Sequence, residues 1–354
     1  MEYKLEELFD LQMGKTPSRS NPEYWNTGDN KWISIADLSK CGKYICETKE
    51  CISDMAVKES GISQIPANTV VMSFKLSIGK TAITSENMYS NEAIMSFRDK
   101  HVVDLLPEYV YYLLQAHNWN EGTNKAVMGK TLNKATLSKI KVSIHSRKEQ
   151  IEIINCLNTV MRIVNTRQQQ LQKLDELVKA RFIELFGNPE TNPKGWTRQR
   201  FDQICENLDS RRVPITSTDR KAGNYPYYGA SGIVDYVEGY IFDEDILLIS
   251  EDGANLVMRS TPIAFSVSGK VWVNNHAHVV RFETKATQKY IEICFALTDI
   301  SGSITGTAQP KLNQAKLNAM MFCVPPIELQ EQFAAFVEQT DKSKVVVQDE
   351  VNGL

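Results

Sequence analysis

The most regular hydrophobic pattern in the chain lies between Arg147 and Phe186. This segment contains neither glycine nor proline, and Gly187-Asn188-Pro189 follows it. Ser146 and Glu149 have the spacing of a capping box. Apolar residues recur at spacings of three and four, which is the period of one helix face. They are Ile154, Leu157, Met161, Val164, Leu171, Leu174, Val178 and Leu185. The pattern predicts one helix about 60 Å long, whose apolar stripe requires a helical partner.

A second helix is predicted from Ile327 to Asn352, introduced by Pro325-Pro326, since proline is tolerated at a helix start. Its stripe consists of Phe333, Phe336, Val337 and Thr340. This helix is shorter than the first, so part of the long stripe stays unmatched. Two interpretations remain open for the partner: the second helix of the same chain, or an external helical protein.

Short β-branched and aromatic runs bounded by glycine, asparagine and proline predict strands elsewhere. The predicted strands are 32–35, 69–74, 92–97, 245–250, 270–273 and 278–282. Short helices are predicted at 108–115 and 290–297. Each half of the chain therefore has a mixed region of strands and turns that is followed by a helix.

An internal repeat explains this order. Leu132-Asn133-Lys134-Ala135-Thr136-Leu137 returns as Leu312-Asn313-Gln314-Ala315-Lys316-Leu317, at a separation close to half of the 354 residues. The same separation aligns Gly122 with Gly302 and Gln150 with Gln330. A weaker echo pairs Asn91-Glu92-Ala93 with Asn275-His276-Ala277. A tandem duplication is predicted.

The fold class predicted is therefore α+β, with two tandem α/β domains joined by long helices in a pseudo-two-fold repeat. The expected boundaries are 1–146 for the first domain, 147–187 for the long helix, 188–326 for the second domain and 327–354 for the short helix.

Composition narrows the class of protein. Hydrophobic residues make up 42% and charged residues 23%, with a net charge of −3. This is ordinary globular composition and excludes a uniformly basic nucleic-acid binder. The start of the chain does not have the pattern of a signal peptide. No apolar run is long enough for a membrane helix, and the seven cysteines contain no Cys-x-x-Cys pair. We expect a cytoplasmic protein with reduced thiols.

No catalytic motif is complete. Three Gly-Lys-Thr triplets, at 14–16, 79–81 and 129–131, lack the upstream glycine of a phosphate-binding loop. Dinucleotide, methyltransferase, serine hydrolase and zinc protease motifs are missing as well. His276 with His278, and the acidic run 243–245, are the remaining candidate metal ligands. We interpret them as ordinary histidines and solvated acids, and predict no catalytic residue, bound cofactor or metal in this chain.

Basic and amide-bearing loops indicate a different role. The span 122–148 is rich in lysine and contains no acid. Two similar domains on a helical spacer would suit contact with two separated points on one polymer, and double-stranded DNA is the natural candidate. The candidate DNA contacts are Lys75, Ser77, Lys80, Lys130, Thr131, Arg211, Arg212, Tyr227, Ser231, Asn255, Lys270, Gln309 and Lys311. The candidate partner-binding helix residues are Ile154, Leu157, Met161, Val164, Leu171, Leu174, Val178, Phe333 and Val337.

An ordered set of motifs resembles the specificity subunits of Type I restriction–modification systems. These motifs are Trp32-Ile33-Ser34-Ile35-Ala36-Asp37-Leu38, Ile65-Pro66-Ala67-Asn68-Thr69-Val70, Ile78-Gly79-Lys80-Thr81-Ala82, Leu174-Asp175-Glu176-Leu177-Val178-Lys179-Ala180-Arg181-Phe182, Tyr225-Pro226-Tyr227-Tyr228-Gly229-Ala230-Ser231-Gly232-Ile233, Gly306-Thr307-Ala308-Gln309-Pro310-Lys311-Leu312-Asn313 and Pro325-Pro326-Ile327-Glu328-Leu329-Gln330. The resemblance covers almost the whole chain.

The resemblance implies a non-catalytic subunit with two target-recognition domains, each reading one half of an asymmetric bipartite DNA site. The helices would pack as long antiparallel coiled-coil helices, set the spacing and dock two methyltransferase (M) subunits, and restriction (R) subunits would join the complex. S-adenosylmethionine, ATP and Mg²⁺ are expected in those partners, and no cofactor in this chain. The short second helix departs from the family pattern, so incomplete pairing or self-association of two copies is a further expectation.

Two other classes of function remain open on the residues alone. The first is a DNA nuclease, or a fragment of a fused restriction enzyme, with a metal site around His276, His278 and Asp243. The second is a coiled-coil scaffold that does not bind DNA.

Overall fold

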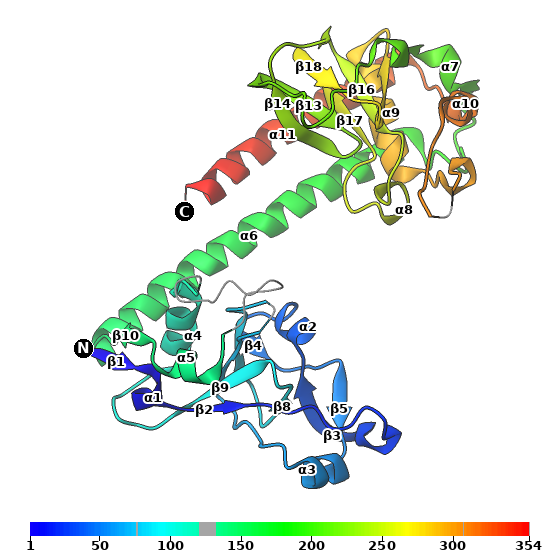
Figure 1. The fold of residues 1–354 in the computed structure, drawn as a ribbon. Coiled ribbons are helices and arrows are strands. Elements are labelled where there is room, and N and C mark those ends of the chain that lie inside the picture. Colours follow the sequence, from blue (N-terminus) through cyan, green and yellow to red (C-terminus); the bar gives the residue numbers. More distant parts are fainter. Residues whose placement is uncertain (76, 120–131, 307, 354) are drawn as a thin grey trace. The chain divides into compact units, whose positions relative to one another are not determined.

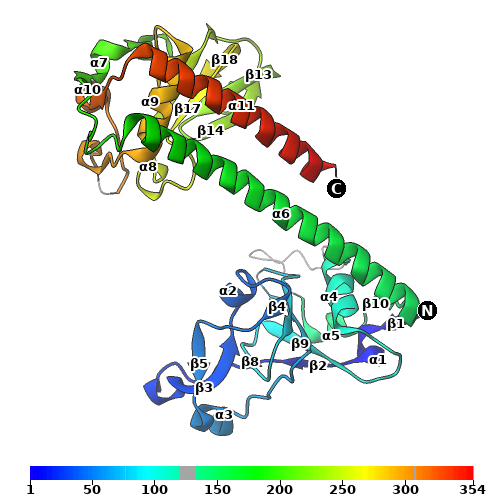
Figure 2. The ribbon, with the colours of Figure 1, turned by 180° about the vertical axis from the view of Figure 1, so that it is seen from behind.

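The computed structural model describes residues 1–75, 77–119, 132–306 and 308–353. The chain divides into two compact units, Met1–Arg162 (unit 1) and Ile163–Leu354 (unit 2). The long helix α6 (Arg147–Phe186) is continuous across this division, so its first turns belong to unit 1 and the rest to unit 2 (Figures 1 and 2).

The larger sheet of unit 1 has the order β2-β9-β6-β7-β4 and a smaller sheet has the order β5-β3-β8. The strands are β2 (Phe9–Met13), β3 (Trp25–Ile33), β4 (Tyr44–Ile45), β5 (Glu50–Ile52), β6 (Val70–Ser73), β7 (Thr81–Thr84), β8 (Tyr89–Ser90) and β9 (Ile94–Asp99). The strand β1 (Glu2–Lys4) pairs with β10 (Lys141–Ser143) just before α6 begins.

The helices of unit 1 are α1 (Leu5–Leu8), η1 (Pro22–Tyr24), α2 (Ile35–Leu38), α3 (Asp54–Ser60), α4 (Pro107–Ala116) and α5 (Lys134–Ser138). The helix α4 packs between the larger sheet and the first turns of α6. The Tyr112 hydroxyl donates to Asn158 Oδ1 at 2.6 Å, and the Leu106 amide donates to Gln150 Oε1 at 3.0 Å. Ile154 joins the same core. The predicted capping box is present, because Ser146 N donates to Glu149 Oε2 at 2.8 Å and Glu149 N to Ser146 Oγ at 3.4 Å.

Unit 2 repeats this plan with sheets in the orders β12-β19-β16-β17 and β14-β13-β18-β15. Its strands are β11 (Arg198–Arg200), β12 (Glu206–Asn207), β13 (Ala222–Gly229), β14 (Gly232–Val237), β15 (Phe242–Asp243), β16 (Ile246–Ser250), β17 (Ala264–Val267), β18 (Lys270–Val273), β19 (Ala277–Arg281) and β20 (Met321–Cys323). Its helices are α7 (Phe201–Ile204), η2 (Asp209–Arg211), α8 (Asn255–Met258), α9 (Lys285–Leu297), η3 (Ser301–Ser303), α10 (Gln314–Ala319) and α11 (Ile327–Asn352).

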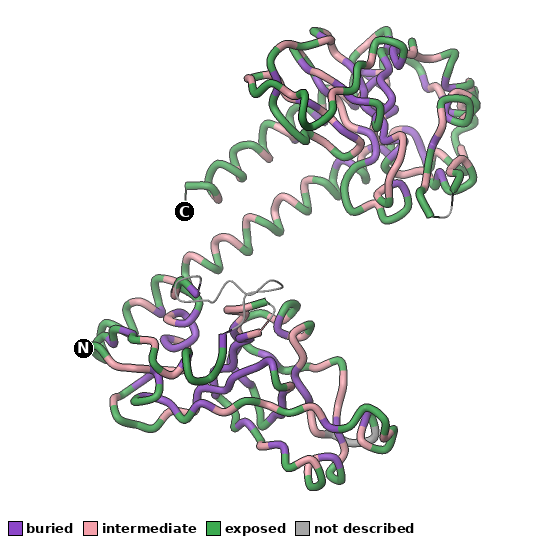
Figure 3. Tube along the Cα trace, in the orientation of Figure 1, coloured by how far each residue is buried: buried purple, intermediate pink, exposed green. Residues whose placement is uncertain are grey.

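Corresponding hydrogen bonds confirm the repeat. Asn133 caps α5 by accepting from Thr136 N, and Asn313 caps α10 by accepting from Lys316 N. The strand β11 pairs with β20 just before α11, as β1 pairs with β10 before α6. The helix α9 takes the place of α4, because α9 packs on α11 as α4 packs on the first turns of α6. Figure 3 shows the buried segments gathered in the sheets of each unit.

Inside unit 2, α6 and α11 form an antiparallel pair. Phe182 and Phe186 each meet Phe333 with ring centroids 5.5 Å apart. Lys344 Nζ lies 2.8 Å from Asp175 Oδ1, and Arg167 Nη2 lies 2.8 Å from Glu350 Oε2. Positions on α11 rise as positions on α6 fall, so the helices run in opposite directions. The partner of the long helix is therefore, over this stretch, the second helix of the same chain.

Local chemistry moves some predicted boundaries. The predicted strand 32–35 ends at Ile33, because Ser34 and Asp37 form a capping box that starts α2. The predicted strand 92–97 begins at Ile94, and α9 begins five residues before the predicted Tyr290 start. In the part of the chain that the structure describes, the helices are too short or too polar to cross a membrane.

Candidate nucleic-acid interface

Several loops of unit 2 meet where β16 ends. The Glu251 amide, next after β16, donates to the His276 carbonyl at 2.9 Å, and the Leu312 amide donates to the Glu251 carbonyl at 2.8 Å. The turn before β19 and the segment before α10 therefore both contact the chain where β16 ends. Sheet register, rather than closeness in sequence, brings these loops together.

The loop from Thr305 to Lys311 is closed by two backbone hydrogen bonds. Thr305 N donates to Lys311 O at 2.8 Å, and Lys311 N donates to Thr305 O at 2.7 Å. Gly306 has a φ of +82°, and a Cβ there would lie 2.5 Å from the Gln309 carbonyl oxygen. Only glycine fits this turn without strain. Gln309 and Lys311 are exposed at the end of the loop.

The β13–β14 turn lies at the same place. Asn274 N donates to Tyr228 O at 3.0 Å, and Ser250 Oγ donates to the Ala230 carbonyl. The turn thus presents the exposed Ser231 beside the end of β16. We call this group of polar side chains the recognition edge of unit 2. It comprises Ser231, Asp252, His276, Gln309 and Lys311.

A buried histidine, His278, contacts the backbone next to the recognition edge. The His278 side chain is 1% exposed, and its Nδ1 lies 2.6 Å from Asp209 Oδ2. Its Nε2 lies 2.7 Å from the carbonyl oxygen of Leu312. Both neighbours are acceptors, so the geometry suits a ring that donates from both nitrogens. Because Leu312 follows Lys311, His278 holds the loop that carries Lys311.

Charged groups extend this support to the surface. Arg212 Nη1 lies 2.6 Å from Glu251 Oε2 and donates to the Ala277 carbonyl at 2.8 Å. Lys311 Nζ lies 3.1 Å from Glu251 Oε1. Glu251 therefore joins a half-buried arginine to an exposed lysine.

The surroundings of the two carboxylates keep them ionised. Burial is the largest influence on the pKa of Asp209 and would raise it. The hydrogen bonds and charge from His278, Val279 N and Arg212 together outweigh burial, so this pKa lies below its usual value. The pKa of Glu251 is also lowered, since contacts with Arg212, His278 and Lys311 outweigh its burial.

The two histidines considered as metal ligands bind separate carboxylates. His276 Nδ1 lies 2.9 and 3.0 Å from the two oxygens of Asp252, while His278 pairs with Asp209. Among the described residues, no group of three or more histidine, cysteine, aspartate or glutamate side chains could hold a metal ion. The metal-dependent nuclease interpretation has no support here.

Unit 1 has an equivalent edge after β6. Phe74 N donates to Ala93 O at 3.0 Å, and Leu132 N donates to Phe74 O at 3.1 Å. Phe74 is therefore the counterpart of Glu251, and Lys75 that of Asp252. Asn91 Oδ1 accepts from Ala93 N at 3.0 Å, as Asn274 Oδ1 accepts from His276 N at 2.8 Å. The counterpart of Asn91 is thus Asn274, so the weaker echo in the sequence analysis is wrong by one residue.

The side chains at the edge of unit 1 differ from those of unit 2. Lys75 is partly exposed, with Nζ 5.3 Å from the Phe74 ring centre, and Ser77 is exposed. A hydrogen bond from Thr16, with the charges of Lys75 and Arg19, keeps the pKa of Glu92 below its usual value despite burial. Lys80 donates to Ser39 Oγ. The candidates Lys130 and Thr131 lie outside the described residues.

Several candidate DNA contacts occupy other places in unit 2. Tyr227 is 1% exposed and its hydroxyl accepts from Ile215 N at 3.0 Å, so its side chain is buried inside unit 2. Arg212 belongs to the network beneath the edge. The Asn255 side chain caps a turn by accepting from Thr261 N at 3.0 Å. These three side chains make hydrogen bonds within the unit.

Two further candidates lie away from the edge. Lys270 begins β18, whereas the edge lies beyond the other end of that strand, after Val273. Arg211 pairs with Glu244 at 2.7 Å and stacks on Phe242. The structure therefore brings together Ser231, Gln309 and Lys311 and separates them from Arg211 and Lys270.

Sequence reasoning missed Asp252 as a site residue and considered His276 only as a metal ligand. One signal could have found Asp252. It follows a buried apolar strand at the place that Lys75 occupies after the corresponding strand of the first half.

The helix residues predicted to bind partners divide between the units. Ile154 and Leu157 pack on the core of unit 1. Val178, Phe333 and Val337 belong to the core of unit 2, whereas Val164, Leu171 and Leu174 are half-buried on the same face of α6. Met161 is 48% exposed.

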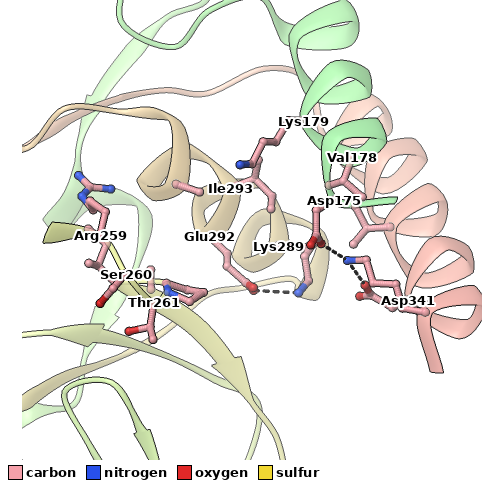
Figure 4. A pocket seen from close by; sticks show the side chains of 16 residues that line it. Asp175, Val178, Lys179, Arg259, Ser260, Thr261, Lys289, Glu292, Ile293 and Asp341 are labelled. Atoms are coloured by element: carbon pink, nitrogen blue, oxygen red, sulfur yellow. Dashed lines mark hydrogen bonds and ion pairs between the residues drawn. The ribbon is translucent and has the colours of Figure 1, made fainter. Parts of the chain in front are cut away.

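A pocket of about 460 Å³ lies between α6, α9 and α11 (Figure 4). Its charges are largely paired. Lys344 bridges Asp175 and Asp341, and Lys289 contacts Glu292 at 2.8 Å.

Comparison with known proteins agrees with this architecture. The family model described as Type I restriction modification DNA specificity domain matches residues 1–176 and 193–350. A Type I restriction enzyme specificity subunit of Methanocaldococcus jannaschii is 24% identical, over 95% of this chain and 85% of that protein. A putative specificity subunit of Haemophilus influenzae is 33% identical over 39% of this chain and 35% of its own length.

A solved structure shares the fold. The S subunit of a Type I restriction–modification system from M. genitalium aligns with a TM-score of 0.55 and 13% identity, covering 100% of this chain and 92% of that chain.

Proposed function

The chain belongs to the family of Type I restriction modification DNA specificity domains and is a non-catalytic specificity subunit, and from this we propose how it reads DNA. Residues 1–146 and 188–326 are the two target-recognition domains, and 147–187 and 327–354 are the helices that space them. Each domain reads one half of a bipartite double-stranded DNA site with its own edge.

The observation that carries this proposal is the repeated edge with different side chains. The backbone hydrogen bonds of Phe74 recur at Glu251, yet the next residue is Lys75 in one unit and Asp252 in the other. The same backbone hydrogen bonds give each edge the same position within its own unit. The side chains at that position differ in their hydrogen-bond donors and acceptors, and therefore select different bases. The two half-sites therefore differ, and the whole site is asymmetric.

Exposed lysines of unit 1 outside the edge supply contacts to phosphate. Lys134, Lys139 and Lys141 are exposed around α5 and β10, and Lys141 Nζ also lies 3.1 Å from Glu2 Oε2. Contacts of this kind give affinity and salt dependence without sequence preference. The selection of bases is left to the edges.

The helices would serve as the spacer and as the surface for partners. The pair formed by α6 and α11 keeps an exposed outer face that includes Leu177, Ile183 and Val346. We propose that two M subunits dock on the helical regions and that R subunits join the complex. Chemistry by S-adenosylmethionine, ATP and Mg²⁺ would then reside in those partners. Self-association of two copies through the unmatched part of α6 remains an alternative use of this surface.

Methylome sequencing tests the proposal. Cells that express this chain with its cognate methyltransferase should carry methyladenine in one split, asymmetric motif. The same cells without this gene should lack the motif. Expression of the methyltransferase with an unrelated specificity subunit is the matched control, and it should give a different motif.

A methylation pattern that does not depend on the gene would contradict the proposal. A symmetric motif would contradict the assignment of different half-sites to the two edges.

A further inference from the structure

We propose that the Asp252–His276 pair reads a base of the half-site recognised by unit 2, and that Lys75 reads the equivalent base position for unit 1. The inference rests on the proposed function and adds the residues and their hydrogen-bonding chemistry. It also predicts which half of the DNA motif each substitution changes.

The position of the pair is the first argument. Asp252 is the second residue after β16, and its counterpart Lys75 is the second residue after β6. His276 lies at the counterpart of Ala93, because its amide and carbonyl make the same two hydrogen bonds. A side chain with ring nitrogens thus stands in unit 2 where unit 1 has only a methyl group. The two edges differ in chemistry at one shared place.

The second argument is that the histidine of the pair is exposed and yet held in position. The His276 side chain is 50% exposed, while Asp252 is 16% exposed. His276 N donates to Asn274 Oδ1 at 2.8 Å, and His276 O accepts from Glu251 N at 2.9 Å. The backbone is therefore fixed on both sides of the exposed ring, and little freedom would be lost on binding.

The network beneath the pair holds the neighbouring charges in place. Glu251 is engaged by Arg212 and Lys311, and His278 is engaged by Asp209 and Leu312. Within the described residues, Asp252 is the side-chain partner of the His276 ring. Such support is typical of residues that act by position.

The hydrogen bonds that His276 can make to a base depend on which of its ring nitrogens is already bonded to Asp252. Nδ1–H donates to Asp252, so Nε2 is left for a ligand. Nε2 accepts from an adenine or cytosine amine when the ring is neutral, and donates to guanine N7 or O6 when it is protonated. The ammonium group of Lys75 only donates, so it suits base acceptors, of which guanine O6 and N7 together offer two. The shared chemistry is a hydrogen bond to a base edge in the major groove.

Methylomes of single variants test the inference. His276→Leu removes the ring nitrogens. Asp252→Asn keeps the shape and one oxygen for Nδ1–H but removes the charge. In each variant, one base position in the half-site read by unit 2 should lose discrimination by about 10- to 100-fold, with the first half-site unchanged. Lys75→Gln should relax one position in the other half-site only, and this arm does not depend on the folding of unit 2.

The matched control is His101→Leu. His101 also pairs with an aspartate, with Nδ1 3.3 Å from Asp99 Oδ2, and is 87% exposed. It lies beyond the end of β9 that is opposite to the edge of unit 1. Both half-sites should stay unchanged in this variant.

The outcomes separate this inference from the proposed function. If the wild-type chain gives no split motif, the proposed function fails. If the wild-type motif exists but the Asp252, His276 and Lys75 variants retain it in full, this inference is overturned. A relaxed base in the wrong half, or loss of all methylation by a variant with the wild-type melting temperature, would also overturn it.

Discussion

Asp209 and His278 form a buried side-chain pair in unit 2. Removal of one member of a buried pair leaves the other charge uncompensated. We expect Asp209→Ala to lower the free energy of unfolding of unit 2 by about 3–5 kcal/mol. Chemical denaturation followed by tryptophan fluorescence measures this, since unit 2 contains Trp196 and Trp272. Asp202→Ala removes the exposed contact with Arg200 and should leave the melting temperature unchanged.

The same pair predicts a dependence of stability on pH. The pKa of Asp209 is lower in the folded protein than in the unfolded chain. The stability that it contributes is therefore fully present above its ordinary pKa of about 4, and is lost as the pH falls toward the lower folded value. The stability advantage of the wild-type chain over Asp209→Asn should shrink between about pH 5 and pH 2. An advantage that stayed constant over this range in parallel denaturation curves would contradict the assignment.

Among the elements of unit 2, the short loop that contains Gly306 is expected to position the side chains of the recognition edge. Gly306→Ala forces a Cβ against the Gln309 carbonyl at a positive φ. We expect weaker binding of cognate DNA and relaxed selection in the half-site of unit 2, measured by fluorescence anisotropy with single-base variants of the target. Gly302→Ala is the matched control, because a Cβ there meets nothing within 4 Å and its φ is not in the left-handed region. Equal losses in both variants would show that the turn does not position the edge.

Aromatic packing at the start of α11 holds the helix pair. Phe333 is fully buried against Phe182 and Phe186. Phe333→Ala should lower the free energy of unfolding by about 3–5 kcal/mol. Val346→Ala, on the exposed side of α11, should have little effect. Lys344→Ala should cost less than about 1 kcal/mol, because its contacts are partly exposed to solvent. Thermal unfolding of the three variants ranks these contributions, and a Lys344 effect equal to that of Phe333 would contradict this ranking.

In the whole molecule, α6 is the element that both units share. An insertion of four helical residues after Ile163 adds about 6 Å of helix and leaves the Arg167–Glu350 contact on its C-terminal side intact. At 3.4 Å per base pair, the unread gap between half-sites should grow by about two base pairs. The methylome of cells that carry the variant measures the gap. An unchanged gap with both half-sites retained would refute the role of α6 as spacer.

The sequence predicted the long elements well. The helix Arg147–Phe186 has a continuous apolar stripe, a capping box and a glycine stop, all of which are local signals. The strand at 92–97 was placed less well, because Glu92 and Ala93 take part in a turn that is held by Asn91 and Phe74. The burial of Tyr227 was not predicted, because no local signal distinguishes an exposed aromatic residue of a strand from a buried one.

Two features of the protein follow from the amino-acid sequence alone: its duplication and its two long helices. The duplication shows as a motif that returns after about half of the chain, and each helix shows as an apolar stripe of local period. The antiparallel pairing of the helices was decided by the tertiary structure. Which residues form each recognition edge was determined only by the tertiary structure. Asp209 meets His278 and Glu251 meets Lys311 across long stretches of sequence. Such contacts depend on strand register and on the direction of each turn, and neither is encoded in a local pattern. The hydrogen bond from Glu251 N to the His276 carbonyl brings Asp252 and His276 together at the edge. The packing of unit 2 buries Tyr227.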